Sequence, residues 1–409
     1  MTKRVAGLML MPKYVDRFTC LGGDCEDTCC SSWRVDLDRT SVRAYQASQD
    51  PELAPLFAQH VRLNPAPRTA RTQGHIEMLD TPCGECPFLD GGGLCRIQAR
   101  LGESALSDTC ASYPRSTVRF GDLLQSVLQL SCPEVARLAL LAPDAFDLEA
   151  REDSVRSGSL MELLPKGGLS QELMEEVRTQ LFQILRTTAL DLSKRLAVIG
   201  FFCLRLTELL EQGKAANLPG LFQATDALLE TGAEEIPLKA LDEREFARVR
   251  FAWVHLLTMV QAQVAAPHQR RVIDAACAGL SIRADGSRDE LALLQGFEVG
   301  TARLALALEA VPFLLEHYLY NEALKGLFPW QEETPHRHFI NLLLNFTVLR
   351  VMLVGRAASQ EATLTPQELA ETVQVFARRM QNGKKLVDQL DPACVGGDWT
   401  RLGTLLTVV

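Results

Sequence analysis

Cysteines crowd the first third of this chain, and no other feature constrains the fold as much. Nine of the twelve cysteines lie within the first 132 of 409 residues, at Cys20, Cys25, Cys29, Cys30, Cys83, Cys86, Cys95, Cys110 and Cys132. The rest of the chain contains only Cys203, Cys277 and Cys394. A chain of this length can bury a large apolar core and needs no cysteine framework to fold. The concentration of thiols therefore favours a thiolate-bound metal ion or an iron–sulfur cluster.

The spacing of these cysteines narrows the kind of site. They form three groups, which are Cys20-x4-Cys25-x3-Cys29-Cys30, then Cys83-x2-Cys86 with Cys95, and finally Cys110 with Cys132. Thiols two to four residues apart can converge on one metal centre, and iron–sulfur clusters take four of them. The paired CxxC motifs of a zinc ribbon are missing from this pattern. We favour an iron–sulfur cluster over zinc, with free core thiols or disulfides as the other interpretations.

Composition and charge limit the class of protein. Apolar residues make up 47% and charged residues 23%, as in ordinary globular proteins. The net charge of −9 argues against nucleic acid as the main partner. The first residues lack the apolar run and cleavage site of a secretory signal, so we expect a cytoplasmic location. Clustered cysteines in that compartment more often bind metal than form disulfides.

Three zones follow one another along the chain. We expect a mainly α protein, in which residues 1–141 form a small, irregular, cysteine-rich module that packs on an all-helical domain at 170–409, with a linker at 142–169. Beyond residue 170 apolar side chains recur at helical spacing, as in Leu192, Leu196, Ile199, Cys203 and Leu206. This spacing predicts further helices, and two short strands are expected earlier in the chain, at 117–120 and 124–130. The predicted helices lie at 238–264, 268–280, 288–310, 312–326, 336–355 and 365–383.

Two further patterns concern ligands and membranes. No glycine-rich phosphate loop or dinucleotide-binding motif is present, so the sequence assigns no cofactor-binding residues. The stretch 251–269 contains no Asp, Glu, Lys or Arg. We interpret it as a buried helix end with a loop, and expect no transmembrane segment; the stretch is also compatible with peripheral membrane contact.

Several segments resemble a known family. The segments MPKYVDRFTCLGGDCEDTCCSSWRVDLD, CPFLDGGGLCRIQARLGESALSDTCASYPR and LQLSCPEVARLALL resemble the flagellin lysine-N-methylases, and beyond them a wider group of iron- or zinc-chelating cysteine-rich domains. The later segment LLEHYLYNEALKGLFPW resembles the helical half of that family. The resemblance implies methyl transfer from S-adenosylmethionine to lysine amines of flagellin, and a [4Fe–4S] cluster held by the cysteines. All of the N-terminal cysteines except Cys83 fall on matching positions.

Candidate site residues follow from the motifs and the resemblance. We predict metal ligands at Cys25, Cys29, Cys30, Cys86, Cys95 and Cys110, with Cys20 and Cys132 as a second group. The hydroxyls of Tyr14 and Tyr113 are candidates for accepting a proton or aligning the substrate, and packing with a bonded hydroxyl is the alternative. Arg115 is a candidate for binding the donor's carboxylate or neutralising cluster charge, and an ordinary salt bridge is the alternative.

The chemistry of lysine methylation defines what the leading function requires, and two other functions are compatible with the sequence. A lysine amine has a pKa near ~10.4 and attacks a methyl group only when it is neutral, so the site must desolvate it or place it near positive charge. We therefore expect a protein-lysine N-methyltransferase that uses S-adenosylmethionine and requires the cluster. The rivals are a non-catalytic iron- or zinc-binding module and an iron–sulfur redox or regulatory protein.

Overall fold

The computed structural model describes residues 4–381 apart from 32, 82, 234–256, 258–265, 284 and 288. The chain separates into two compact units. One consists of Met1–Glu162 with Val264–Val272, and the other of Leu163–Gln263 with Ile273–Val409. We call them the sheet unit and the helical unit and describe each by itself.

A five-stranded mixed sheet organises the sheet unit. The strand order is β7-β1-β6-β5-β8, with β1 at Arg4–Pro12, β5 at Arg115–Phe120, β6 at Leu123–Leu128, β7 at Leu148–Arg156 and β8 at Leu160–Glu162. Side chains along β1 alternate, so that Met9 and Met11 are buried while Leu8 is exposed. The interior strand β1 pairs with β6 in parallel. It also pairs with the edge strand β7 antiparallel, from Arg4 opposite Arg156 to Pro12 opposite Leu148.

The sheet confirms one sequence expectation and corrects two others. The predicted strand pair is present, because β5 and β6 form an antiparallel hairpin from Arg115 opposite Leu128 to Phe120 opposite Leu123. The N-terminal module is not irregular, however, since it is built on this sheet. Segment 142–169 is more than a linker, because it supplies β7 and β8. The sequence of β7, LEAREDSVR, is charged because its first five residues are exposed on an edge strand, and it therefore lacks an alternating apolar pattern.

A smaller layer of the same unit packs with four of the cysteines, Cys30, Cys86, Cys95 and Cys110. The strands β2 (Val35–Leu37), β4 (Gly74–Ile76) and β3 (Val61–Leu63) form a three-stranded antiparallel sheet. Helices α2 (Arg39–Gln46) and α3 (Leu53–His60) contribute to an apolar core in which the rings of Tyr45 and Phe57 stack at 4.4 Å. Four short helices complete the unit, which are α1 (Tyr14–Arg17), α4 (Arg96–Leu101), α5 (Asp108–Ser112) and α6 (Pro133–Leu140).

The helical unit contains the predicted helices that lie within the described residues, together with a helix at Leu218–Glu230 that was not predicted. It contains α7 (Gln171–Arg186), α8 (Leu192–Glu211), α9 (Leu218–Glu230), α12 (Glu290–Leu308), α13 (Leu314–Lys325), α14 (Pro335–Ala358) and α15 (Pro366–Gln381), while α11 (Pro267–Gly279) has residues in both units. Cys203 and Cys277 are buried, as expected of core thiols. Most of the predicted helix 238–264, most of the uncharged stretch 251–269, and Cys394 lie outside the described residues.

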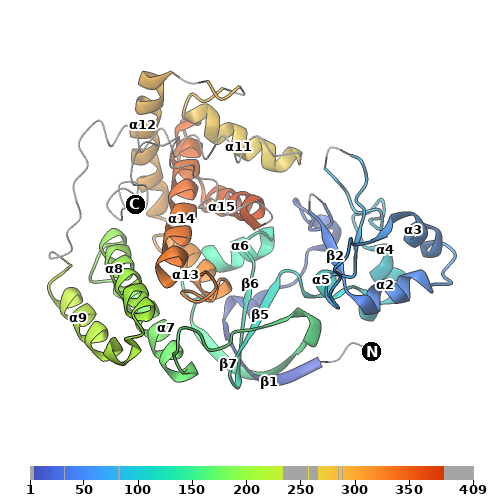
Figure 1. Cartoon of the computed structure of the whole chain (residues 1–409). Helices are drawn as coiled ribbons and strands as arrows, with labels where there is room; N and C mark the ends of the chain where they lie inside the picture. The colour runs from blue at the N-terminus through green and yellow to red at the C-terminus, as the bar shows by residue number, and fades with distance from the viewer. Residues whose placement is uncertain are drawn as a thin grey trace. The chain divides into compact units, whose positions relative to one another are not determined.

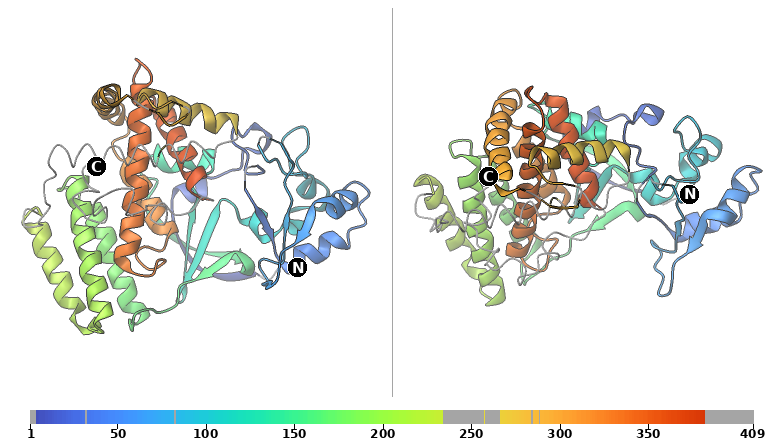
Figure 2. Two further views of the ribbon diagram at one scale, coloured as in Figure 1. Left: turned by 45° about the horizontal axis from the view of Figure 1, so that its top comes forward. Right: turned by 90° about the horizontal axis from the view of Figure 1, so that it is seen from above.

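Helix α14 is the centre of the helical unit. It contacts α8, α12, α13 and α15, as Figure 1 shows, and most of its side chains are buried. Glycines let neighbouring backbones approach it: a Cβ on Gly300 of α12 would lie 2.2 Å from the carbonyl oxygen of Val354, and one on Gly355 would lie 2.2 Å from that of Ala276 in α11. The close pairing of α12 with α14 can be followed in the two further views of Figure 2.

Within the described residues, two helices have the length and apolar composition of membrane-spanning helices. They are α12, whose most apolar window is 28% buried, and α14, whose window is 78% buried. Core helices of soluble proteins pass the same test, and the burial of α14 is typical of a core helix.

Candidate functional site

A cavity of about 610 Å³ lies within the sheet unit, and eight of the nine N-terminal cysteines line it. The eight are the residues that fall on the family-like positions: Cys20, Cys25, Cys29, Cys30, Cys86, Cys95, Cys110 and Cys132. Cys83, the cysteine without a counterpart in the resemblance, is not part of the lining. The volume is typical of cavities that hold a small-molecule ligand or cofactor.

Short helices and turns position these thiols. Cys95 and Cys132 occupy the N-cap positions of α4 and α6, and Cys110 lies in the first turn of α5. The hydroxyl of Ser107 caps α5 by accepting a hydrogen bond from the Cys110 amide at 3.2 Å. Cys29 and Cys30 share a turn, and the Cys86 amide donates to the Cys30 carbonyl at 2.8 Å. Residues far apart in sequence therefore reach one cavity.

Two glycine loops meet at the edge of this cavity. A Cβ on Gly23 would lie 2.4 Å from the carbonyl oxygen of Gly92, which places it inside contact distance. Gly93 has φ +76°, a conformation that glycine adopts without strain. The glycines of the loop 91–93 thus let the backbone of the loop before Cys95 pack against the loop between Cys20 and Cys25. Their role is close packing, and no phosphate-binding motif is needed to explain them.

Burial favours the protonated form of four of the cavity thiols. It raises the pKa of Cys25 and of Cys110 to about 11, and the pKa of Cys86 and of Cys132 to about 12. Neighbouring thiols raise these pKa values further, since Cys110, Cys95 and Cys29 act on Cys86, while Cys25 and Cys29 act on Cys132. A metal that binds here must displace these protons, which is the normal course of thiolate coordination.

The arrangement of the cavity thiols can be compared with what metal sites require. Among the described residues, no three Cys, His, Asp or Glu side chains are placed to hold a metal ion. Thiolates on one zinc ion lie roughly 3.8 Å apart, given a Zn–S bond of about 2.3 Å in a tetrahedron. The four thiolates of an iron–sulfur cluster bind different irons and stand farther apart. The thiols that line the cavity are therefore not assembled, in the described part of the chain, as a set of ligands for one metal ion.

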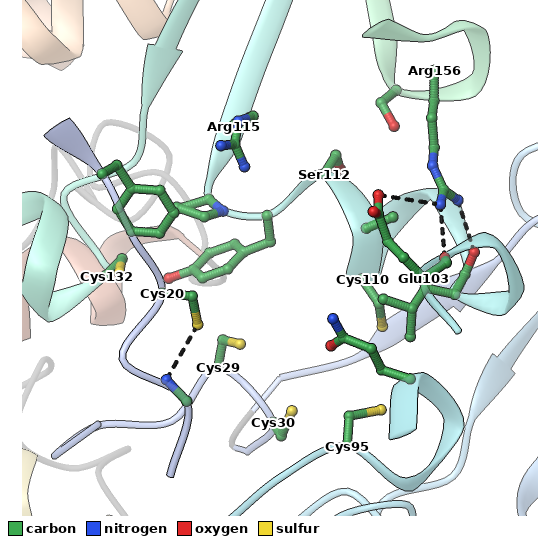
Figure 3. A pocket seen from close by; sticks show the side chains of 18 of the residues that line it. Cys20, Cys29, Cys30, Cys95, Glu103, Cys110, Ser112, Arg115, Cys132 and Arg156 are labelled. Atoms are coloured by element: carbon green, nitrogen blue, oxygen red, sulfur yellow. Dashed lines mark hydrogen bonds and ion pairs between the residues drawn. The ribbon is translucent and has the colours of Figure 1, made fainter. Parts of the chain in front are cut away.

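Tyr113 and Arg115 lie in the same wall of the cavity. The Tyr113 hydroxyl is 3.0 Å from the Ser131 hydroxyl, and its ring packs against Trp33 at 5.6 Å. The Arg115 guanidinium lies over the Phe18 ring at 5.6 Å and has no carboxylate partner in the described part of the chain. Figure 3 shows Arg115 on the side of the cavity where Cys20 and Cys132 lie. An unpaired cation at the cavity wall can bind an anion there.

The other tyrosine candidate, Tyr14, lies in the core. Its side chain is 0% exposed, and it is not part of the cavity lining. Its hydroxyl donates to the Leu128 carbonyl at 3.1 Å and accepts from the Leu128 amide at 3.0 Å. These contacts attach α1 to β6. The structural role of the hydroxyl in the sheet therefore explains why a tyrosine occupies this position.

Polar residues that the motifs did not single out complete the lining. The buried Arg156 of β7 donates to the carbonyls of Leu106 and Glu103, at 2.9 and 2.8 Å, and holds the chain on both sides of η2 (Glu103–Ala105) near Cys110 (Figure 3). Arg156 was missed because its strand lies in the segment taken as a linker. Asp27 is 5% exposed, lines the cavity, and accepts hydrogen bonds from the Gln269 amide at 3.1 and 3.2 Å. No local pattern links these two residues, which are 242 positions apart.

Fold and site together define a class of protein: a thiol-lined cavity in a mixed α/β unit, followed along the chain by a helical unit. Comparison with known proteins then gives the family. Residues 178–408 match the family model of the FliB lysine N-methylase C-terminal domain. The match covers more than half of the chain, which therefore belongs to the FliB lysine N-methylase family.

Similar proteins support this assignment over part of their length. The chain is 39% identical over 140 residues to a lysine-N-methylase of Salmonella typhimurium, and the match covers 34% of each chain. It is 36% identical over 149 residues to the flagellar biosynthetic protein FliU of Salmonella muenchen, covering 36% of this chain and 86% of FliU. The chain thus matches about a third of the length of the lysine-N-methylase. No solved structure matches the chain.

Proposed function

We propose that this chain is a protein-lysine N-methyltransferase that uses S-adenosylmethionine, acts on flagellin, and requires a [4Fe–4S] cluster held by its N-terminal cysteines. One observation carries the proposal: all eight cysteines on family-like positions line one cavity, while the ninth, Cys83, does not. Membership of the lysine N-methylase family supports methyl transfer as the reaction. The name of the FliU relative supports a flagellar substrate.

The cavity residues suit this reaction in specific ways. Burial in the cavity disfavours the charged form of an incoming lysine side chain, and the sulfonium of a nearby donor disfavours it further. The Tyr113 hydroxyl, bonded to Ser131, would receive the lysine proton and pass it on. The Arg115 guanidinium is available to bind the carboxylate of the donor. The cluster would supply a Lewis-acidic or redox-active centre beside these groups.

The donor set fits the cluster that we propose. A cavity wall made of eight thiols, with no histidine in its lining, suits iron and sulfide better than harder metals. The negative charge of a thiolate-bound cluster would be balanced in part by Arg115, which the described carboxylates leave unpaired.

The test measures composition and activity separately. Protein purified without oxygen is analysed for iron, sulfide and zinc, and then incubated with methyl-labelled S-adenosylmethionine and flagellin. We expect iron and sulfide in equal amounts, together with label on flagellin lysines. Stoichiometric zinc without sulfide would contradict the cluster, and absence of label from flagellin with the cluster intact would favour a redox or regulatory protein.

A matched pair of variants tests whether the cavity thiols hold the cluster. Cys95→Ser removes a cavity thiol, and Cys83→Ser removes a thiol of the same unit that does not line the cavity. We expect Cys95→Ser to lose iron and methyl transfer together and Cys83→Ser to keep both. A fully active Cys95→Ser protein without iron would show that methyl transfer does not depend on the cluster.

A further inference from the structure

Aromatic rings line the same cavity as the thiols. Within the described residues they are those of Phe18, Trp33, Tyr45, Phe88 and Tyr113. Tyr45 and Phe88 are buried and both pack on Phe57, at 4.4 and 5.1 Å, so the apolar core of the smaller layer accounts for them. The other three rings are only partly buried, and they present surface to the cavity.

Trp33 and Tyr113 contact each other in the cavity wall. Their ring centroids are 5.6 Å apart, and the ring planes are inclined at 46°. The indole N–H donates to the Cys29 carbonyl at 2.5 Å, and the Tyr113 hydroxyl is 3.0 Å from that of Ser131. Because the polar atom of each ring is bonded to the protein, both ring planes are held in position. We call Trp33 and Tyr113 the aromatic corner.

Ring faces of this kind attract cations. The face of an aromatic ring carries partial negative charge, and tryptophan is the strongest of the three aromatic residues in this respect. The same wall already contains one such contact, since the Arg115 guanidinium lies over the Phe18 ring at 5.6 Å. A methylated cation has no N–H with which to donate a hydrogen bond, so an aromatic face is its natural partner in a protein.

The proposed methyl transfer involves two methylated cations, and its chemistry favours one of them for this position. An aromatic contact with the lysine ammonium would stabilise the charged amine, which must lose its proton before it attacks. The donor sulfonium is charged at every pH. When the lysine lone pair forms the new N–C bond, the S–C bond breaks and its electron pair stays on sulfur. The product is then a neutral thioether, which an aromatic face holds less strongly.

The position of the corner agrees with the role that we propose for Arg115. Ser131, the partner of the Tyr113 hydroxyl, directly precedes Cys132 in the chain. Figure 3 shows Arg115 on the side of the cavity where Cys132 lies. The carboxylate and the sulfonium of the donor are joined by a short carbon chain, so a donor held by Arg115 would have its sulfonium on the same side of the cavity as Tyr113.

We propose that the aromatic corner binds the sulfonium of S-adenosylmethionine and favours this charged donor relative to its neutral product, S-adenosylhomocysteine. The inference rests on the proposed function for the identity of the donor. It makes Trp33 a specificity-determining residue of the cavity, in addition to its packing against the core of the smaller layer.

The test compares two ligands within each variant. Dissociation constants for S-adenosylmethionine and S-adenosylhomocysteine are measured by calorimetry on the full chain, for the wild type, Trp33→Phe and Trp33→Leu. Both substitutions remove the hydrogen bond to the Cys29 carbonyl, but only Phe keeps an aromatic face. We expect the preference for the charged ligand, taken as the ratio of the two constants, to fall about 10-fold in Trp33→Leu and to be largely kept in Trp33→Phe.

The ratio distinguishes recognition of charge from packing. Lost packing would weaken both ligands alike, so an unchanged ratio in Trp33→Leu would overturn the inference. An equal fall in both variants would assign the effect to the hydrogen bond with Cys29 and would also overturn it. Should Trp33→Leu fail to fold, Tyr113→Leu removes the other ring of the corner and gives the same comparison.

Two further arms separate the source of the cation and the fate of the proposed function. Flagellin peptides with trimethyllysine and with its neutral tert-butyl isostere are titrated into the same variants. A Trp33-dependent preference for the charged peptide, with an unchanged donor ratio, would assign the corner to lysine and reject our inference. Label on flagellin with an unchanged donor ratio would keep the proposed function and reject the corner. A Trp33-dependent donor ratio without label would keep the corner and reject flagellin as the substrate.

Discussion

Two tyrosines of the sheet unit have different roles: one lines the cavity, and the other supports the fold. Tyr113 lies at the cavity with its hydroxyl on Ser131, whereas Tyr14 is buried with its hydroxyl on both backbone groups of Leu128. In the sequence both are polar aromatic residues of family-like segments, so sequence reasoning treated them alike. Only the contacts distinguish them, because the partner of Tyr14 is 114 residues away.

Changing Tyr113 to Phe tests its chemical role. Loss of the hydroxyl removes the proton acceptor of the proposed reaction, so we expect kcat for flagellin methylation to fall about 100-fold, within the usual range for a lost general base. Iron content and affinity for S-adenosylmethionine should not change. An unaltered kcat would assign the hydroxyl to hydrogen bonding with Ser131 alone.

Changing Tyr14 to Phe should affect stability instead. The substitution leaves the buried carbonyl and amide of Leu128 without their side-chain partner, which costs about 1 to 3 kcal/mol of unfolding free energy. Chemical denaturation of the two Tyr→Phe variants in parallel measures the difference. If Tyr14→Phe were as stable as the wild type but inactive, Tyr14 would have a direct role in the reaction.

At the scale of elements, helices were predictable and the sheet was only partly so. Most helices of the second half have three-four apolar spacing that a sequence shows directly, and the observed bounds of α11 to α15 lie within a few residues of the prediction. Helix α9 was not predicted. The sheet depends on the pairing of β1 with β7, and the exposed, charged sequence of β7 gives no local sign of that pairing. The eight cavity cysteines were identified by motif, whereas Arg156 and Asp27 depend on contacts across 50 residues or more.

The close packing of α12 on α14 gives a prediction, and a glycine of α9 serves as its control. In Gly300→Ala the new Cβ would lie 2.2 Å from the Val354 carbonyl oxygen, so α12 and α14 must move apart, at a cost of about 1 to 3 kcal/mol of unfolding free energy. Gly220 of α9 has open space at the same position, and Gly220→Ala should stabilise the protein by about 0.5 to 1 kcal/mol. Equal effects in thermal unfolding of the two variants would contradict the close approach.

At the scale of the whole molecule, the cavity that we propose to bind the cluster belongs to the sheet unit only. Every residue of the cavity lining lies between Arg4 and Ser159, in the sheet unit, whereas the family model matches residues 178–408. The chain therefore carries its cavity thiols and the sequence that matches the family model in different units. Both parts were needed to reach the proposed function.

Binding of metal should therefore slow local opening more in the sheet unit than in the helical unit. A ligand stabilises the state that binds it, and its effect on local opening is greatest near its own contacts. We expect loading to slow amide hydrogen exchange around residues 20–30, 83–96 and 107–115 and to leave α14 nearly unchanged. Exchange measured by mass spectrometry on metal-free and reconstituted protein gives the comparison. Equal slowing in both units would show that they open together.

The pairing of the first strand with β7 also has a consequence for synthesis on the ribosome. From Pro12 to its partner Leu148 the chain must grow by well over a hundred residues. At a synthesis rate of ~5–20 residues per second, β7 follows β1 after on the order of 10 s. Until then, β1 lacks this pairing partner. The cysteines from Cys20 to Cys132 lie between these two strands in the chain, so they are synthesised before β7 is available. Delivery of iron and sulfide is thus expected to follow release of the sheet unit from the ribosome, so that the timing of translation decides when the cell must supply them.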